Sequence, residues 1–80
     1  MTALERVAQV FRRTFSLAAG RKVDAETTPD HVPEWDSIGH MNLVSGLEKE
    51  FGLRFEVDEI MEMSSVAKIL ELLAKRGVNV

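Results

Sequence analysis

Cysteine is absent from this chain of 80 residues, proline occurs twice and tryptophan once. Without cysteine there is no disulfide bond and no cysteine-ligated zinc, so packing alone must stabilise the core. A domain of this size buries only about 60% of the surface that its unfolded chain exposes. The chain also lacks a thiol, so a function that needs one must obtain it from a prosthetic group.

Long hydrophobic runs are also missing, since no stretch approaches the roughly 18 apolar residues of a membrane span. Charged residues follow directly on Leu4, which is not typical of a signal peptide. We therefore expect a cytoplasmic protein without a membrane-spanning segment. An apolar share of 45% with 6% aromatics is typical of a globular helical protein. The length predicts one domain over residues 1–80.

Charge is unevenly distributed along the chain, which has a net charge of −3. Residues 1–23 carry +4, whereas residues 34–62 carry −6. The net negative charge disfavours binding to nucleic acid. An acidic surface in one half suits partner proteins with basic patches, because such fields accelerate encounter. A solvated face that keeps a small domain soluble is the alternative explanation.

The first segment has the periodicity of an amphipathic helix. Thr2 can cap its start, with Glu5 as the partner in a capping box. Gly20 is placed to end it, because glycine accepts a left-handed conformation. The apolar residues at spacings of three and four are Leu4, Val7, Phe11, Phe15 and Ala18.

A long connection follows over residues 20–35, interrupted by two prolines. We expect it to cross the ends of the helices, held by its apolar residues Val23, Val32 and Trp35. A second helix is predicted from the pair Asp36–Ser37 to Gly52, with Leu53 in the position of a Schellman contact. Its predicted buried stripe comprises Leu43, Leu47 and Phe51, flanked by Met41 and Val44.

Two further helices complete the predicted fold. Residues 58–63 indicate a short helix with Ile60 and Met63 turned inward. Ser64 or Ser65 caps the last helix, which Gly77 ends. No β-strand pattern is present, so the sequence predicts an all-α bundle of three longer helices and one short third helix. The apolar stripe of the last helix is Val66, Ile69, Leu70 and Leu73.

The start of the second helix is the most informative segment, with residues 35–44 reading WDSIGHMNLV and residues 47–52 reading LEKEFG. Over roughly residues 30–75 the chain closely resembles acyl and peptidyl carrier proteins, in which an Asp-Ser-Leu triplet opens this helix. A helix start suits a phosphate, because its free N–H groups and positive dipole end attract anions.

The resemblance implies an acyl-carrier-protein-like fold and a 4'-phosphopantetheine arm attached covalently to Ser37, with Asp36 and Ile38 beside it. The arm carries acyl or aminoacyl groups as thioesters for fatty-acid, polyketide or related secondary biosynthesis. Asp36 is expected both to cap the helix and to contact the phosphopantetheinyl transferase. Expected partners are that transferase and acyl-loading and acyl-processing enzymes with basic docking patches, acting on a monomer. The predicted docking residues are His40, Met41, Glu48 and Glu59.

Several alternatives stand beside this interpretation. Asp36 and Ser37 are also ordinary helix caps. Ile38 and Met41 either line the mouth through which an acyl chain enters or are simply core or interface residues. A serine hydrolase built on Asp36, Ser37 and His40 fails on geometry, because side chains of one helical turn point outward side by side. We therefore expect no enzyme, and His40 is expected to be exposed.

Other functional classes receive less support from the sequence. A carrier fold that has lost its cargo and serves as an adaptor or structural binding module is the main rival to the carrier. Two isolated histidines, with His31 expected to be exposed, do not make a metal site. Asp58 and Glu59 lack the spacing of a calcium loop.

The first turns after Ser37 depart from the family pattern. Carrier proteins of fatty-acid synthesis usually place acidic residues there, whereas this chain has Gly39, His40 and Asn42. This difference favours a specialised carrier with dedicated enzymes. Glycine in a helix interior lowers stability by up to about 1 kcal/mol relative to alanine, so its presence at position 39 needs a reason. We expect that a side chain is absent there because a partner or the arm passes close to Gly39.

Overall fold

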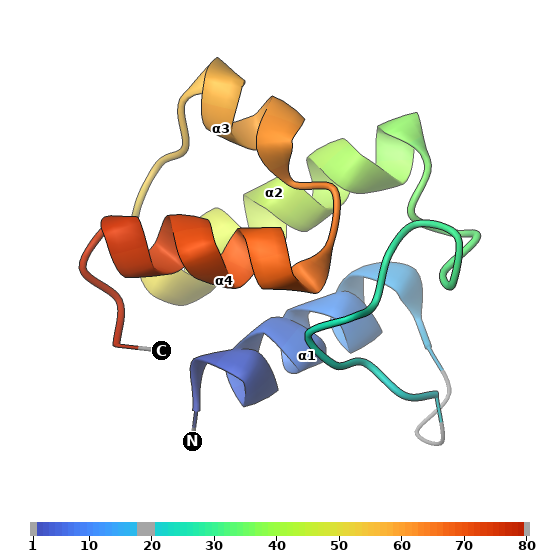
Figure 1. The fold of residues 1–80 in the computed structure, drawn as a ribbon. Helices are drawn as coiled ribbons and strands as arrows, with labels where there is room; N and C mark the ends of the chain where they lie inside the picture. Colours follow the sequence, from blue (N-terminus) through green and yellow to red (C-terminus); the bar gives the residue numbers. More distant parts are fainter. Residues whose placement is uncertain (1, 18–20, 80) are drawn as a thin grey trace.

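The computed structural model describes residues 2–17 and 21–79, and within these residues it contains four helices and no strand (Figure 1). The helices are α1 (Ala3–Phe15), α2 (Ser37–Phe51), α3 (Val57–Glu62) and α4 (Val66–Lys75). The all-α bundle of three longer helices and a short third one is confirmed. Gly20, at which the first helix was expected to end, lies outside the described residues.

Local capping explains where most of these helices begin. Thr2 accepts a hydrogen bond from the Glu5 N–H, and the Glu5 carboxylate accepts one from the Thr2 N–H, which is the predicted capping box. Asp36 caps α2 and Ser65 caps α4. α2 ends at Gly52, whose φ is 66°, and Leu53 N–H donates to the Glu48 carbonyl as in a Schellman motif.

The end of α1 differs from the prediction. The helix stops at Phe15 because Ser16 adopts a left-handed conformation with a φ of 52°. The N–H of Leu17 then donates to the Arg12 carbonyl at 3.1 Å, and the Leu17 side chain is buried. This turn satisfies the last carbonyls without glycine and directs the chain back across the core.

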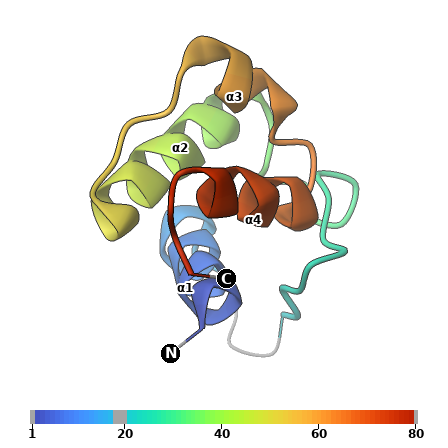
Figure 2. The same cartoon turned by 60° about the vertical axis from the view of Figure 1, so that its left-hand side comes forward.

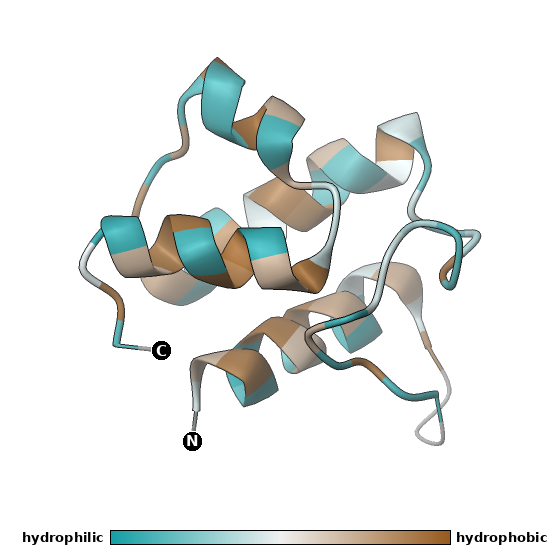
Figure 3. Cartoon of the chain, in the orientation of Figure 1, coloured by the Kyte–Doolittle hydropathy of each residue, from teal (hydrophilic) through white to brown (hydrophobic). Residues whose placement is uncertain are grey.

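The core lies where α1 packs against α2 and α4. Val10 Cγ1 would lie 2.9 Å from a Cβ added at Gly46, so this glycine lets α1 and α2 approach closely. Polar and apolar residues alternate around α1 and α4, as Figure 3 shows. The largest side chains that are fully buried are Phe11, Leu43, Leu47, Ile69, Leu73, Val7, Val10, Val32 and Val66.

The long connection is held as expected. Val23, Val32 and Trp35 are all buried within the core cluster. In addition, the carbonyls of Ala25 and Thr27 accept hydrogen bonds from Ala67 N–H and Val66 N–H at the start of α4. The connection therefore closes the N-terminal end of α4 and satisfies backbone donors that a helix start otherwise leaves free.

α3 is the least buried of the helices, because none of its residues is classed as buried. It begins at Val57, one residue before the predicted start, because Glu56 N–H donates to the Glu59 carboxylate. Met63, directly after it, is buried as predicted, and Ile60 is partly buried. In both views α3 lies on the opposite side of the molecule from α1 (Figure 1 and Figure 2).

An ion pair joins the start of α1 to the end of α2. Arg6 Nε donates to a Glu50 carboxylate oxygen at 2.9 Å, and a second Arg6 nitrogen donates to the Glu50 carbonyl at 2.8 Å. The Arg6 guanidinium also lies 4.4 Å from the centre of the Phe51 ring. The hydrogen bond from Arg6, aided by the charges of Arg6 and Arg13, holds the pKa of Glu50 below its ordinary value.

This lowered pKa predicts a pH dependence of stability. A carboxyl whose pKa is depressed by folding stabilises the protein above its unfolded pKa, which is about 4.3 for glutamate, and loses that contribution as the pH falls. We expect Glu50→Gln to lower the melting temperature at pH 7, and the difference from the wild type to vanish toward about pH 3. Melting followed by circular dichroism tests this. Glu26→Gln, at an exposed carboxylate of the connection, serves as the control. An unchanged difference at low pH contradicts the prediction.

Candidate functional site

Ser37 is the first residue of α2, and its side chain is exposed. Asp36 immediately before it adopts an extended conformation, and its Oδ1 accepts a hydrogen bond from Gly39 N–H at 2.8 Å. The capping role predicted for Asp36 is therefore confirmed. Because Asp36 supplies the cap, the Ser37 hydroxyl is not needed for it. The hydroxyl thus lies at the helix start, open to another molecule.

Trp35 anchors the chain just ahead of the serine. Its ring is buried and meets the Phe11 ring edge to face, with centroids 5.0 Å apart. The indole N–H donates to Nδ1 of His40 at 2.7 Å. The position of Ser37 is therefore determined from both sides, by a buried residue before it and by a helix after it.

A shallow hollow lies beside Ser37, between the start of α2 and the end of α3. Met41 and Met61 are large apolar residues at its edge, with 53% and 79% of their surface exposed. No signal in the sequence marks Met61 as a site residue, because its place beside Ser37 depends on how α3 packs. The residues that line this hollow are Pro29, Trp35, Asp36, Ser37, His40, Met41, Ile60 and Met61.

The structure excludes one interpretation of Ile38 and Met41, which is that they are core residues. Ile38 is 77% exposed and Met41 is 53% exposed, so neither belongs to the core. The prediction that Met41 flanks a buried stripe of the second helix is therefore wrong. The reason is its position on the helix, since Leu43, Val44 and Leu47 occupy the inward face. Met41 lines the hollow beside Ser37, whereas Ile38 lies outside it.

His40 is half-buried, which corrects the expectation that it is exposed. One ring nitrogen accepts from the Trp35 indole, and the other lies 2.8 Å from the Ile60 carbonyl oxygen. Both nitrogens are thus engaged away from the Ser37 hydroxyl. This geometry does not provide the general base that a serine hydrolase needs.

The two glutamates predicted to dock partners both have intramolecular partners. Glu48 accepts a hydrogen bond from Phe55 N–H at 2.9 Å and so closes the turn after α2. Glu59 pairs with Arg76 at 2.7 Å. Its pKa is lowered, first by the hydrogen bond from Glu56 N–H and then by Arg76. The docking roles of Glu48 and Glu59 remain predictions.

Gly39 has a different role from the predicted one. It is buried, and a Cβ at this position would collide with the Glu34 carbonyl oxygen and lie 2.9 Å from Cε1 of Phe15. The connection, and not a partner or an arm, therefore passes close to Gly39. The sequence could not show this, because Phe15 lies far from it along the chain.

This contact predicts that Gly39→Ala destabilises the protein, although alanine favours helices. Overpacking typically costs about 1–3 kcal/mol, which exceeds the gain of up to about 1 kcal/mol in helix propensity. Urea unfolding measures the difference. Asn42→Ala, at an exposed position of the same helix, is the control and should change stability by less than about 0.5 kcal/mol. A Gly39→Ala protein as stable as the control contradicts the packing argument.

Within residues 2–17 and 21–79, no three His, Cys, Asp or Glu side chains are grouped so that they could hold a metal ion. No helix in the described part of the chain is long and apolar enough to cross a membrane.

The fold and the site together define a small helical domain with an exposed serine at the start of α2. A family model described as a phosphopantetheine attachment site matches residues 34–73. Acyl carrier protein 5, chloroplastic, from Arabidopsis thaliana is 30% identical to this chain over 70 residues. That alignment covers 88% of this chain and 50% of the relative, so the chain spans half of the relative's length. No solved structure matches the chain.

The chain belongs to the phosphopantetheine attachment family, as the resemblance of its second helix predicts. Domains of this family carry 4'-phosphopantetheine covalently, and they are carriers and not enzymes. They interact with phosphopantetheinyl transferases and with acyl-processing enzymes. The matched residues include the whole of α2 and α3, which border the hollow beside Ser37.

Proposed function

We propose that this chain is an acyl carrier, and that Ser37 is the residue to which the phosphopantetheine arm is attached. The observation that carries the proposal is the exposed hydroxyl at the first position of α2, next to a cap that Asp36 provides. The hydroxyl is thus free for modification, and its backbone position is held by the buried Trp35. We further propose that residues 1–80 act as one monomeric carrier domain in the cytoplasm.

The residues at this site fit a phosphodiester. The N–H groups of Ser37 and Ile38 belong to the first turn, where helices have no internal partners for them. The first turn itself contains no acidic residue, so only the carboxylate of the Asp36 cap offsets the positive end of the helix dipole there. Both features favour an anion bonded to the Ser37 oxygen. When bound, the arm supplies the thiol that a chain without cysteine lacks.

Attachment requires the Ser37 oxygen to form a new bond to phosphorus. The oxygen attacks the phosphate next to the pantetheine half of coenzyme A, the bond between the two linked phosphates breaks, and the nucleotide half leaves. The hydroxyl proton passes to a base of the transferase. On this proposal the chain contributes an accessible nucleophilic oxygen and a surface that the transferase recognises, including Asp36.

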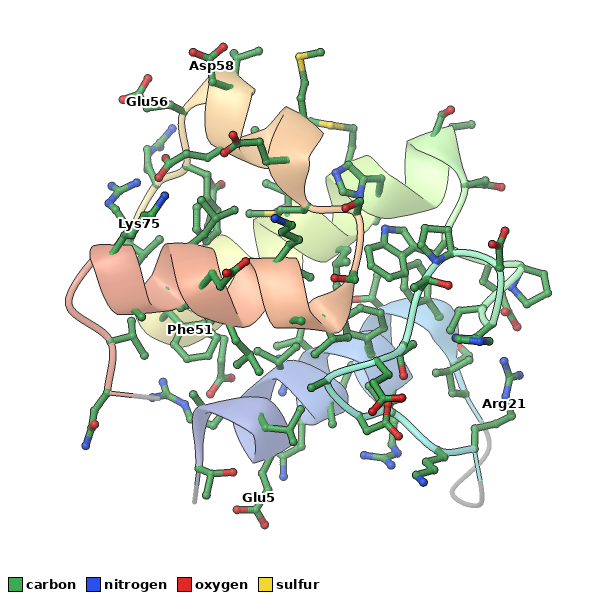
Figure 4. All side chains as sticks on the ribbon, viewed as in Figure 1. Glu5, Arg21, Phe51, Glu56, Asp58 and Lys75 are labelled. Atoms are coloured by element: carbon green, nitrogen blue, oxygen red, sulfur yellow. The ribbon has the colours of Figure 1, made fainter. Side chains whose placement is uncertain are left out.

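The exposed residues of α2 and α3 suit partner proteins that offer both apolar and basic contacts. Ile38, Met41 and Met61 are exposed large apolar residues on α2 and α3. At the start of α3, the end away from the hollow beside Ser37, Glu56 and Asp58 point away from the molecule (Figure 4). A partner with an apolar centre and basic residues at its rim would match both features.

The proposed cargo is an acyl group. A relative named an acyl carrier protein supports acyl cargo, held as a thioester. Fatty-acid, polyketide or related secondary biosynthesis is the pathway class that we propose. α2 has no acidic side chain before Glu48, and this supports the proposal that the partner enzymes are dedicated to this carrier.

The test is a loading experiment on the intact chain. The protein is incubated with coenzyme A and a phosphopantetheinyl transferase of broad specificity, and its mass is measured. We expect the mass to increase by one phosphopantetheine. Trypsin should then release residues 23–49 as one modified peptide, since this range contains no internal Lys or Arg. Fragmentation should place the group on Ser37 and not on Ser45. A chain that stays unmodified with several transferases favours the adaptor.

A further inference from the structure

His40 makes two hydrogen bonds that together determine which of its ring nitrogens carries the hydrogen. The Trp35 indole N–H can only donate, so the Nδ1 that receives it at 2.7 Å must carry no hydrogen. The hydrogen of a neutral ring then lies on Nε2, which donates to the Ile60 carbonyl at 2.8 Å. The two rings lie side by side and nearly coplanar, with an interplanar angle of 13° and centroids 6.1 Å apart, as this edge-to-edge hydrogen bond requires. We assign His40 as this neutral tautomer.

These bonds connect three parts of the fold that are separate along the chain. His40 is on α2, Trp35 ends the connection before Ser37, and Ile60 is on α3. Such a hydrogen bond matters for the position of α3, because this helix has six residues and none of them is buried. A second polar contact of α3 is the Glu59–Arg76 ion pair, which lies toward the end of α4. The hydrogen bond from His40 therefore connects α3 to the region of Ser37.

We propose that His40 is a positioning residue, which holds α3 against the segment before Ser37 and so sets the surface that loading enzymes meet. The inference rests on the proposed attachment at Ser37 for its functional part. Met41 and Met61 stand on the two sides of the hollow that His40 bridges. If the bridge is lost, the α3 side of this hollow is no longer held at a defined distance from Ser37.

The indole N–H of Trp35 provides a signature of this arrangement that simple packing lacks. It donates to Nδ1 of His40 at 2.7 Å, and a side chain without an acceptor at that position cannot receive this hydrogen bond. The environment of the indole N–H should therefore report whether the bridge is intact.

Three substitutions separate the effects of the two hydrogen bonds of His40, one with Trp35 and one with Ile60. His40→Asn retains an acceptor near the position of Nδ1 and loses the bond to Ile60. His40→Gln retains a donor near the position of Nε2 and loses the bond from Trp35. His40→Leu removes both bonds and keeps an apolar side chain. Asn42→Ala, exposed on the same helix, is the matched control.

The first measurement uses the free, full-length chain. Trp35 is the only tryptophan, so its indole N–H gives a single resonance in the nuclear magnetic resonance spectrum. In the wild type and in His40→Asn this resonance should have the position of a hydrogen-bonded indole. In His40→Leu and in His40→Gln it should have the position of a free indole. An indole resonance that is the same in the wild type and His40→Leu overturns the proposal.

The second measurement is amide hydrogen exchange in α3, followed by loading. Loss of one hydrogen bond should accelerate exchange in residues 57–62 by roughly tenfold in His40→Leu and His40→Asn. His40→Gln should stay closer to the wild type. The rate of loading at Ser37 should fall in the same order. Unchanged α3 exchange in both His40→Leu and His40→Asn overturns the proposal, even if loading slows, because His40 then acts as a direct contact of the enzyme.

The two proposals fail in different ways. If the wild type is not loaded by any transferase, the proposed function is wrong, and the indole and exchange data alone decide the role of His40. If loading is normal in the wild type and equally normal in all three His40 variants, the attachment site stands and the positioning role is overturned.

Discussion

The Ser37→Ala protein is expected to gain no mass with coenzyme A and a transferase, while its fold remains intact. The loss should be complete, because alanine has no oxygen to which the phosphate can be attached. Stability should change little, since Ser37 is exposed and the helix cap is provided by Asp36. Intact-mass measurement tests the loss, and thermal melting followed by circular dichroism tests the fold.

Ser45→Ala is the matched control for this experiment. Ser45 is also an exposed serine of α2, but it lies beyond the first turn. It therefore lacks the free N–H groups and the positive dipole end that favour a phosphate at Ser37. Ser45→Ala should be loaded like the wild type. A Ser37→Ala chain that still gains one phosphopantetheine places the attachment elsewhere and contradicts the proposed site.

Phe11→Ala should have the largest effect on stability, about 3–5 kcal/mol, as typically observed when a buried phenylalanine is truncated. Phe11 is completely buried in α1, and its ring meets the rings of Phe15 and Trp35 edge to face. At about 0.05–0.15 kcal/mol per residue, a domain of this size has a stability of roughly 4–12 kcal/mol. The substitution therefore removes a large part of it.

Urea unfolding followed by the fluorescence of Trp35 measures this loss directly, because the Trp35 ring packs against the altered side chain. Phe51→Ala is the control, since Phe51 is only partly buried at the end of α2. Its cost should be clearly smaller. Equal losses in the two variants contradict the assignment of Phe11 to the centre of the core.

The helix starts illustrate what the sequence was sufficient to predict. Thr2 with Glu5 and Asp36 with Gly39 are three residues apart, so a cap forms within one turn and needs no distant partner. The helical periodicity of the apolar residues predicted the four helices for the same reason. Ser37 was predicted because its type, its position at a helix start and its neighbours agree with one family pattern.

The errors concern residues whose environment depends on how the connection and the helices pack against one another. Gly39 is small because the Glu34 carbonyl and the Phe15 ring lie against it. The start of α1 was predicted correctly and its end was not, because Ser16 adopts a left-handed conformation that lets Leu17 enter the core. The sequence alone shows neither the need for a small residue at position 39 nor the end of α1 at Phe15. Both depend on how the elements pack against one another.

The sequence alone therefore sufficed for the helical class, for most of the helix starts and for the position of Ser37 at a helix start, because all three depend on contacts within a few residues. The surroundings of that serine depend on tertiary packing. Only packing brings His40 between Trp35 and Ile60 and places Met61 opposite Met41. These residues belong to different helices and to the connection, and their approach is decided by how the apolar faces of the whole chain bury one another.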